Sequence, residues 1–225
     1  GADFQGKNIV MDANGTSFEL LYEGSRYPVK MNLIGDFNVY NALTAIAAVE
    51  AVGIPLSFIS QSLSCAKQVK GRFEKIKEKF GPTVIIDYAH TPDGLQNILE
   101  TANKLGAKRV ILVFGCGGDR DRTKRPVMGK IGGTLSDFAL ITSDNPRTEE
   151  PMSIIRMVEE GVKESGGAYE IRCDRREAIH DAVLMANDDD LVVIAGKGHE
   201  DYQIIGTEKH HFDDFEEVKK ALALC

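Results

Sequence analysis

From residue 71 onward, short apolar runs alternate with longer amphipathic segments, and this alternation leaves few possible folds. Five apolar runs have the length and composition of buried strands: residues 84–86, 110–114, 138–141, 169–173 and 191–195. Five segments have apolar residues at helical spacing: residues 94–105, 127–135, 153–164, 175–186 and 213–224. Parallel strands need a crossover segment between them, usually a helix. The predicted fold class is therefore α/β, with a doubly wound, mostly parallel sheet.

The first part of the chain has a different pattern. Three runs are typical of strands: residues 7–11, 17–22 and 27–33. The dipeptide Asn14-Gly15 between the first two runs is a strong hairpin signal. Two helices are then expected, over residues 38–52 and 56–65. The boundary falls near residues 68–71, so we predict an α+β part, residues 1–69, and an α/β part, residues 70–225.

Composition excludes several classes of protein. The chain of 225 residues is 43% hydrophobic and carries a net charge of −7, which argues against general nucleic-acid binding. No apolar stretch reaches the roughly 18 residues of a membrane span, and the first residues are unlike a signal peptide. The four cysteines are scattered without a CxxC pair, and no cluster has metal-binding spacing. We therefore expect a cytoplasmic protein without a metal site, a membrane segment or a nucleic-acid partner.

Four predicted strands are each followed by a loop that carries polar side chains: residues 87–93, 115–122, 142–147 and 196–200. The carboxyl ends of parallel strands meet at one edge of a sheet, which is where α/β proteins hold their ligands. The glycine-rich loop matches neither the dinucleotide fingerprint nor a Walker loop, but its glycines allow close backbone approach. Cys116 in this loop could be exposed, and we expect it to be a spectator thiol.

The segment Asp144-Asn145-Pro146-Arg147 combines groups that suit an amino acid. Arg147 can bind a carboxylate with two parallel hydrogen bonds, and Asp144 attracts an ammonium group. An ordinary turn with a solvated arginine is the alternative. The loop at residues 196–200 adds Lys, His and Glu, which offer charge and acid–base capacity. Together the four loops predict a cleft for a small zwitterion and a phosphorylated partner.

Other polar residues are expected to cap helices, to contact a base or to lie in a solvated turn. Asn38 is expected to be a helix N-cap, whereas Asn41, one turn further along, can read an adenine edge. Either Thr91 or Asp93 should cap the helix that follows them. The acidic triplet at residues 188–190 is most simply a solvated turn.

The order and spacing of six segments resemble the Mur ligase family: residues 35–41, 71–74, 87–93, 117–121, 144–147 and 196–200. The segments look like those of the member that adds the third peptide residue in peptidoglycan synthesis. The resemblance implies a Rossmann-like C-terminal domain and ATP-dependent amide formation, with Mg²⁺ as a further cofactor. It also implies meso-diaminopimelate and UDP-MurNAc-L-Ala-D-Glu as the small-molecule substrates, and we expect a monomer.

The resemblance also implies roles for individual residues. ATP would be surrounded by Asn38, Asn41, Arg72, Asp87 and His90. The incoming amino acid would be held by Arg120, Asp144, Asn145, Arg147, Gly196 and Glu200. Arg147 would discriminate between diaminopimelate and lysine. Diaminopimelate has a second carboxylate that lysine lacks, and an arginine can bind a carboxylate with two hydrogen bonds.

The chain also departs from the family pattern. The phosphate loop Gly-x-x-Gly-Lys-Thr/Ser occurs nowhere in it. Also absent are the uridine-nucleotide domain and the segment with the magnesium ligands and the modified lysine. We therefore expect residues 1–69 to be the end of the central ATP-binding domain and residues 70–225 to be the complete amino-acid-binding domain. We also expect that the chain contains no catalytic residues and that it is inactive alone.

Three alternatives stay open. The chain could be a stand-alone, non-catalytic module that binds a nucleotide or an amino acid. It could also belong to a lysine-adding relative, which Arg147 disfavours, or to a folylpolyglutamate synthase, which the loop at residues 196–200 disfavours.

Overall fold

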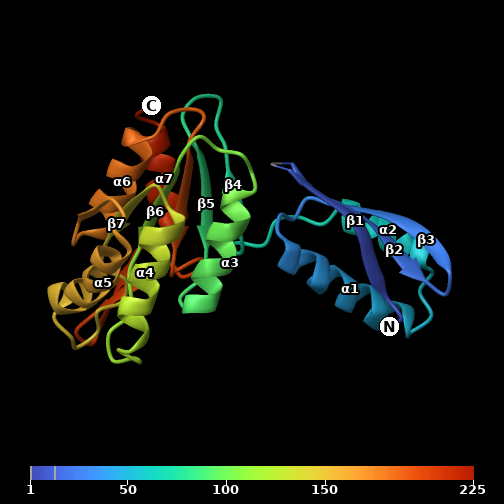
Figure 1. Ribbon diagram of the computed structural model, residues 1–225, viewed down its shortest axis with the longest axis horizontal. Coiled ribbons are helices and arrows are strands. Elements are labelled where there is room, and N and C mark those ends of the chain that lie inside the picture. The colour runs from blue at the N-terminus through green and yellow to red at the C-terminus, as the bar shows by residue number, and fades with distance from the viewer. Residues whose placement is uncertain (1, 13) are drawn as a thin grey trace. The chain divides into compact units, whose positions relative to one another are not determined.

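The structure is a computed structural model that describes residues 2–12 and 14–225 (Figure 1). The chain forms two units, one that ends at Gln68 and one that extends from Val69 to Cys225. The sequence-based boundary between residues 69 and 70 lies one residue from this division. No helix among the described residues is both long and apolar enough to cross a membrane.

The first unit is a three-stranded antiparallel sheet followed by two helices. Its elements are β1 (Gln5–Asp12), β2 (Gly15–Tyr22), β3 (Ser25–Met31), α1 (Asp36–Glu50) and α2 (Leu56–Ser64). The strands pair in the order β1-β2-β3, as the predicted hairpin requires, although residue 13 of its turn lies outside the described residues. Alternate residues of β2, Phe18 and Leu20, are buried against Val39 and Ile46 of α1. One apolar face of the sheet therefore forms this unit's core.

The start of α1 differs from the prediction. The helix begins at Asp36 after Gly35, whose φ of 115° is open to glycine but rare for other residues. Asn38 lies inside the first turn, and its amide donates to the carbonyl oxygen of Ile34 at 2.9 Å. The expectation that Asn38 is the N-cap is therefore wrong.

The second unit contains a six-stranded sheet in the order β4-β5-β9-β6-β7-β8. Strand β4 is antiparallel to β5, and the other pairs are parallel. The strands are β4 (Glu74–Ile76), β5 (Thr83–Asp87), β6 (Val110–Phe114), β7 (Phe138–Ile141), β8 (Tyr169–Ile171) and β9 (Leu191–Ala195). The helices are α3 (Pro92–Asn103), α4 (Lys124–Leu135), α5 (Pro151–Ser165), α6 (Arg175–Met185) and α7 (Asp214–Leu222). The predicted α/β fold with a doubly wound, mostly parallel sheet is confirmed.

Helices cover both faces of this sheet. Helices α6 and α7 pack on the face formed by alternate strand residues such as Ile111 and Val113. Helix α4 lies on the opposite face, where a side chain on Gly132 would collide with Phe114, and α3 and α5 flank it. Helices α4 and α5 approach so closely that a Cβ on Gly161 would overlap the carbonyl oxygen of Pro126. Glycine at this crossing permits the tight helix pair.

Three strands were not expected from the sequence. Strand β4 has only three residues, two of them charged, and the hairpin of β10 (Tyr202–Ile205) and β11 (Glu208–His211) is mostly exposed. Neither shows the apolar run that identified the other strands. The acidic triplet forms the predicted turn before β9 with Asp188 and Asp189 exposed, but Asp190 is not solvated as expected. Asp190 is 2% exposed and accepts hydrogen bonds from Arg109 and from the backbone N–H of Asn187, so it closes a structured turn.

Candidate functional site

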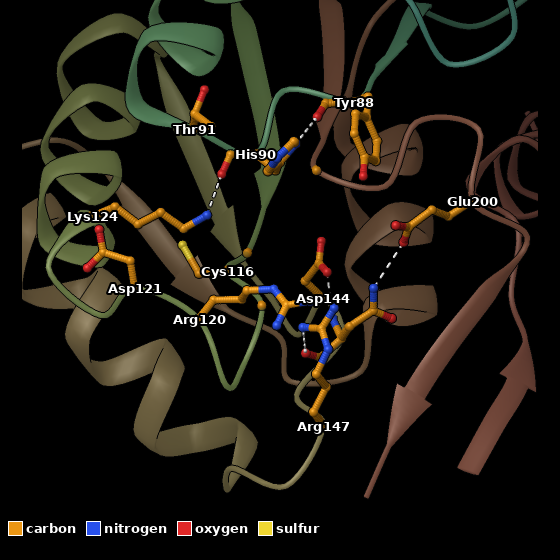
Figure 2. A pocket seen from close by; sticks show the side chains of 14 residues that line it. Tyr88, His90, Thr91, Cys116, Arg120, Asp121, Lys124, Asp144, Arg147 and Glu200 are labelled. Atoms are coloured by element: carbon orange, nitrogen blue, oxygen red, sulfur yellow. Dashed lines mark hydrogen bonds between the residues drawn. The ribbon is translucent and has the colours of Figure 1, made fainter. Parts of the chain in front are cut away.

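The loops after β5, β6, β7 and β9 meet at the carboxyl edge of the sheet and enclose a cavity of about 300 Å³ (Figure 2). All six residues predicted to hold an amino acid line this cavity: Arg120, Asp144, Asn145, Arg147, Gly196 and Glu200. His90 also lines it, together with Lys124. Parallel strand pairing thus brings together side chains that are far apart in sequence, such as His90 and Glu200, which are 110 positions apart.

Asp87, at the end of β5, is buried and holds the backbone around it. Its carboxylate accepts from the N–H groups of Phe73 at 2.7 Å and Ala89 at 2.8 Å. Burial raises the pKa of Asp87, while these two hydrogen bonds lower it. Arg72 lies over the ring of Tyr88, 4.9 Å from its centroid. Asp87 therefore joins the segment that carries Arg72 to the loop after β5.

His90 and Lys124 lie on the side of the cavity next to the start of α3. The Nδ1 atom of His90 is 2.8 Å from the carbonyl oxygen of Tyr88, so Nδ1 carries the hydrogen. Lys124 donates to the carbonyl oxygen of His90 at 2.6 Å (Figure 2). Thr91 accepts from the N–H of Gly94, which confirms the predicted cap. The cavity wall here is therefore a hydrogen-bonded helix start with a cation beside it.

Asn38 and Asn41 belong to the first unit. They lie one turn apart on α1, and the amide nitrogen of Asn41 donates to the side-chain oxygen of Asn38 at 3.1 Å. The two amides therefore form one polar pair on this helix.

The glycine-rich loop packs against the loop that follows β7. A side chain on Gly118 would overlap the carbonyl oxygen of Pro146. A Cβ on Gly117 would lie 2.9 Å from Nη1 of Arg147, closer than Cβ atoms approach other groups. The glycines, expected to let a ligand approach, here admit the neighbouring loop and the Arg147 guanidinium.

Glu149 fastens these two loops together, and sequence reasoning missed it. Its carboxylate accepts two hydrogen bonds from Arg125, at 2.8 and 3.0 Å, and one from the N–H of Asp119 at 2.6 Å. Arg122 pairs with the same carboxylate at 3.1 Å. The bond from Arg125 is the main reason that the pKa of Glu149 falls to about 2. Residues 120–125 contain four basic side chains. Two of them, Arg122 and Arg125, are thus used to hold the loops.

The backbone of Arg147 is held by strand β10. Its N–H donates to the carbonyl oxygen of Ile204 at 3.0 Å, and its own carbonyl oxygen accepts from Gly206 at 2.7 Å. The φ angle of Arg147 is 52°, an unusual value for a residue with a side chain. Nη1 donates to the carbonyl oxygen of Gly118 at 2.8 Å, and the guanidinium lies beside that of Arg120 (Figure 2). Two arginines thus present positive charge to the cavity.

Anionic groups lie on the adjoining wall. Asp144 is buried, and a Cβ on Gly196 would lie 2.7 Å from its Oδ2, so glycine keeps this carboxylate accessible. Asn145 donates from its side chain to Glu200 at 2.9 Å. The fully buried Lys197 donates to Glu200 at 3.0 Å, and it is the second residue that sequence reasoning missed. A cavity lined by both guanidinium groups and carboxylates suits a zwitterion.

Cys116 lines the cavity but is only 3% exposed. Burial raises the pKa of its thiol to about 12, so at neutral pH it carries its proton and is a poor nucleophile. The expectation that this thiol could be exposed is therefore wrong. Among the described residues, no group of three or more His, Cys, Asp or Glu side chains is arranged to hold a metal ion.

Known proteins match the chain along almost its whole length. The family described as Mur ligase, glutamate ligase domain, matches residues 71–198, and the Mur ligase middle domain matches residues 1–49. The chain is 47% identical to UDP-N-acetylmuramoyl-L-alanyl-D-glutamate–2,6-diaminopimelate ligase of Clostridioides difficile, over 99% of this chain and 46% of the relative. The ligase of the same name from Halalkalibacterium halodurans is 50% identical over 95% of this chain and 43% of the relative.

A solved structure of a ligase with this name has a TM-score of 0.72 and 38% identity, over 99% of this chain and 46% of that one. The chain thus spans just under half the length of these relatives. Both units are matched, and the alignment with the first of these relatives covers 99% of the chain. The chain therefore belongs to the Mur ligase family.

Proposed function

We propose that this chain is the amino-acid-binding part of a ligase that adds meso-diaminopimelate to UDP-MurNAc-L-Ala-D-Glu at the expense of ATP. One observation carries the proposal. The guanidinium of Arg147 and the carboxylates of Asp144 and Glu200 line the same cavity at the sheet edge. The names of the relatives at 47% and 50% identity support the choice of substrate.

In the proposed reaction, ATP phosphorylates the D-Glu carboxylate and leaves as ADP. The amine of the incoming amino acid then attacks the acyl phosphate, the amide bond forms and phosphate leaves. The residues of this chain hold the end of diaminopimelate that does not react. Arg147, with Nη1 already bonded to Gly118, offers its remaining N–H groups to the distal carboxylate. Asp144 and Glu200 accept from the neighbouring ammonium group. The reacting amine is then positioned, which lowers the entropic cost of the attack.

The first unit and the start of the second contribute to the ATP site in this proposal. Residues 1–69 form the C-terminal part of the central ATP-binding domain, and residues 70–225 form the amino-acid-binding domain. In the first unit, the proposed ATP-binding residues are Asn38 and Asn41 on α1. In the second unit, they are Arg72, Asp87 and His90. Mg²⁺ is held mostly by residues outside this chain.

We further propose that the chain alone does not turn over ATP. The sequence contains no Gly-x-x-Gly-Lys-Thr/Ser loop, whose backbone and lysine cradle the phosphates in P-loop enzymes. Phosphate release by the 225-residue chain, with both substrates and Mg-ATP present, is the measurement. Sustained release above the rate without enzyme would refute this part of the proposal.

The substrate assignment is tested by comparing amino acids in the intact ligase. With ATP and UDP-MurNAc-L-Ala-D-Glu supplied, kcat/KM is measured for meso-diaminopimelate and for L-lysine. Lysine lacks the distal carboxylate and leaves Arg147 unpaired, so we expect discrimination on the order of 100-fold. Equal use of lysine would favour a lysine-adding ligase. If the intact protein binds the amino acid or the nucleotide but forms no ligation product, a non-catalytic binding module would be favoured.

A further inference from the structure

Lys197 is the feature of the site that the proposed function leaves without a role. Its side chain is 0% exposed, and it does not line the cavity. An ammonium group buried in this way is strongly unfavourable unless its N–H groups are bonded. The partners of Lys197 therefore indicate why the chain keeps a charge at this position.

The ammonium group of Lys197 has two hydrogen-bond acceptors and an aromatic ring as neighbours. Nζ lies 3.0 Å from Oε2 of Glu200 and 3.3 Å from Oδ1 of Asn145. It also lies 5.3 Å from the ring centroid of Tyr202, within the range of a cation–π contact. Two of the three N–H groups of the ammonium are thus used by oxygens of the protein, and the ring of Tyr202 lies near its charge. Lys197 therefore acts on a ligand through its neighbours.

Lys197 also fixes which way the amide of Asn145 points. The side-chain oxygen of Asn145 faces Nζ of Lys197 and the N–H of Ile204 at 2.9 Å, two groups that can only donate. The amide nitrogen must therefore point toward Glu200, to which it donates one hydrogen at 2.9 Å. Its second hydrogen is directed elsewhere, and Asn145 lines the cavity. A reversed amide would place its NH₂ group against two donors.

Two other cations among the described residues are 0% exposed, and they differ from Lys197. Arg175 makes paired hydrogen bonds with Asp214 at 2.8 Å, and Arg125 makes them with Glu149. Neither Asp214 nor Glu149 lines the cavity. Of these three buried cations, only Lys197 has a carboxylate partner, Glu200, that lines the cavity.

We propose that Lys197 is a positioning residue for amino-acid recognition. It holds Oε2 of Glu200 and Oδ1 of Asn145, so that a carboxylate oxygen and an amide N–H face the cavity side by side. The carboxylate accepts from the ammonium group of the amino acid, and the amide donates to its carboxylate. This inference rests on the proposed function, because it takes an amino acid as the occupant of the cavity.

The test compares Lys197→Met, Glu200→Gln and the double variant in the intact ligase. Lys197→Met should raise KM for diaminopimelate by at least about tenfold, because two charge-assisted contacts lose their donor. KM for ATP should stay within about twofold. In the double variant the increase should be smaller than the product of the two single increases, as expected for residues that act as a pair. Lys130→Met, which removes an exposed lysine paired with Glu164, is the matched control and should leave both constants unchanged.

An unchanged KM for diaminopimelate in Lys197→Met, or increases that multiply, would overturn the inference. If Glu200→Gln and Arg147→Ala both leave that KM unchanged, the proposed function fails instead. A second measurement covers the case in which Lys197→Met does not fold. The double variant buries no unpaired charge, so ¹H–¹⁵N spectra of the 225-residue chain can compare it with Glu200→Gln. The side-chain NH₂ signals of Asn145 should shift between the two, and unshifted signals would refute a contact with Lys197.

Discussion

Replacing Arg147 by glycine separates the role of its guanidinium from the role of its backbone. The φ angle of 52° costs a non-glycine residue about 1–2 kcal/mol, whereas glycine adopts it freely. Arg147→Gly therefore removes the charge without adding backbone strain. Glycine removes the strain energy of this φ angle, but the substitution also loses the hydrogen bonds from Nη1 to the carbonyl oxygens of Gly118 and Asn145, which partly offsets that gain in stability. We expect only a small change in the free energy of unfolding.

The effect on binding should be much larger. Nη1 is used by two backbone carbonyl groups, so the remaining N–H groups are those that would meet the distal carboxylate of diaminopimelate. A hydrogen bond to a charged group contributes about 1.5–3 kcal/mol. At about 1.4 kcal/mol per factor of ten, KM for diaminopimelate should rise by about 10- to 150-fold. KM for ATP should remain within about twofold of the wild-type value, because in the proposed function Arg147 meets only the amino acid.

The assay is steady-state ligation by the intact enzyme, with each substrate varied in turn and thermal unfolding recorded for each variant. Arg147→Lys keeps the charge but loses the planar fork, so its KM for diaminopimelate should lie between wild type and Arg147→Gly. Arg156→Ala removes an exposed arginine of α5 that does not line the cavity, and it should behave as wild type. Equal increases in KM for both substrates would refute the assigned role of Arg147.

Three further outcomes are expected. Alkylation of the folded chain at pH 8 should modify the three exposed cysteines and spare Cys116, whose pKa is raised to about 12 by burial, and mass spectrometry that finds Cys116 equally modified would contradict this. Glu149→Gln should lower the free energy of unfolding most at neutral pH. Because the pKa of Glu149 is depressed from 4.5 to about 2 in the folded chain, the difference from wild type should shrink as pH falls through that window, and a constant difference would argue against the pair with Arg125. Gly161→Ala should cost about 1–3 kcal/mol in urea unfolding, because the new Cβ meets the backbone of α4, whereas Arg156→Ala on the same helix should cost little.

The central strands of the parallel sheet were predicted correctly for one reason. Segments such as Val110–Phe114 and Leu191–Ala195 are apolar at every position, because a central parallel strand is buried on both faces. The hairpin of β10 and β11 lacks that signal, since one side of it is exposed and its polar residues suit a loop equally well. Asn38 was misplaced for a related reason. A capping residue is a local signal, but the start of α1 was decided by the turn at Gly35.

The candidate cavity was predictable to a large extent. Its residues follow strands whose parallel order brings their ends together, so the sequence already placed Asp144, Arg147 and Glu200 at one edge. The supporting residues were not predictable. Glu149 reads as an ordinary surface acid before a helix, and Lys197 reads as one more charge in a polar loop. Their partners are 24 and 52 positions away in sequence, at Arg125 and Asn145.

The sequence by itself determined the α/β alternation, the edge of the sheet that carries the polar loops and the residue types that face a ligand, because these follow from local periodicity and from the geometry of parallel strands. Only the tertiary structure decided which charges are buried and what each is bonded to. Burial depends on contacts between distant segments, and a buried charge must find a partner there. For this reason Lys197, which looks like a solvated residue in the sequence, becomes the fully enclosed cation behind Asn145 and Glu200.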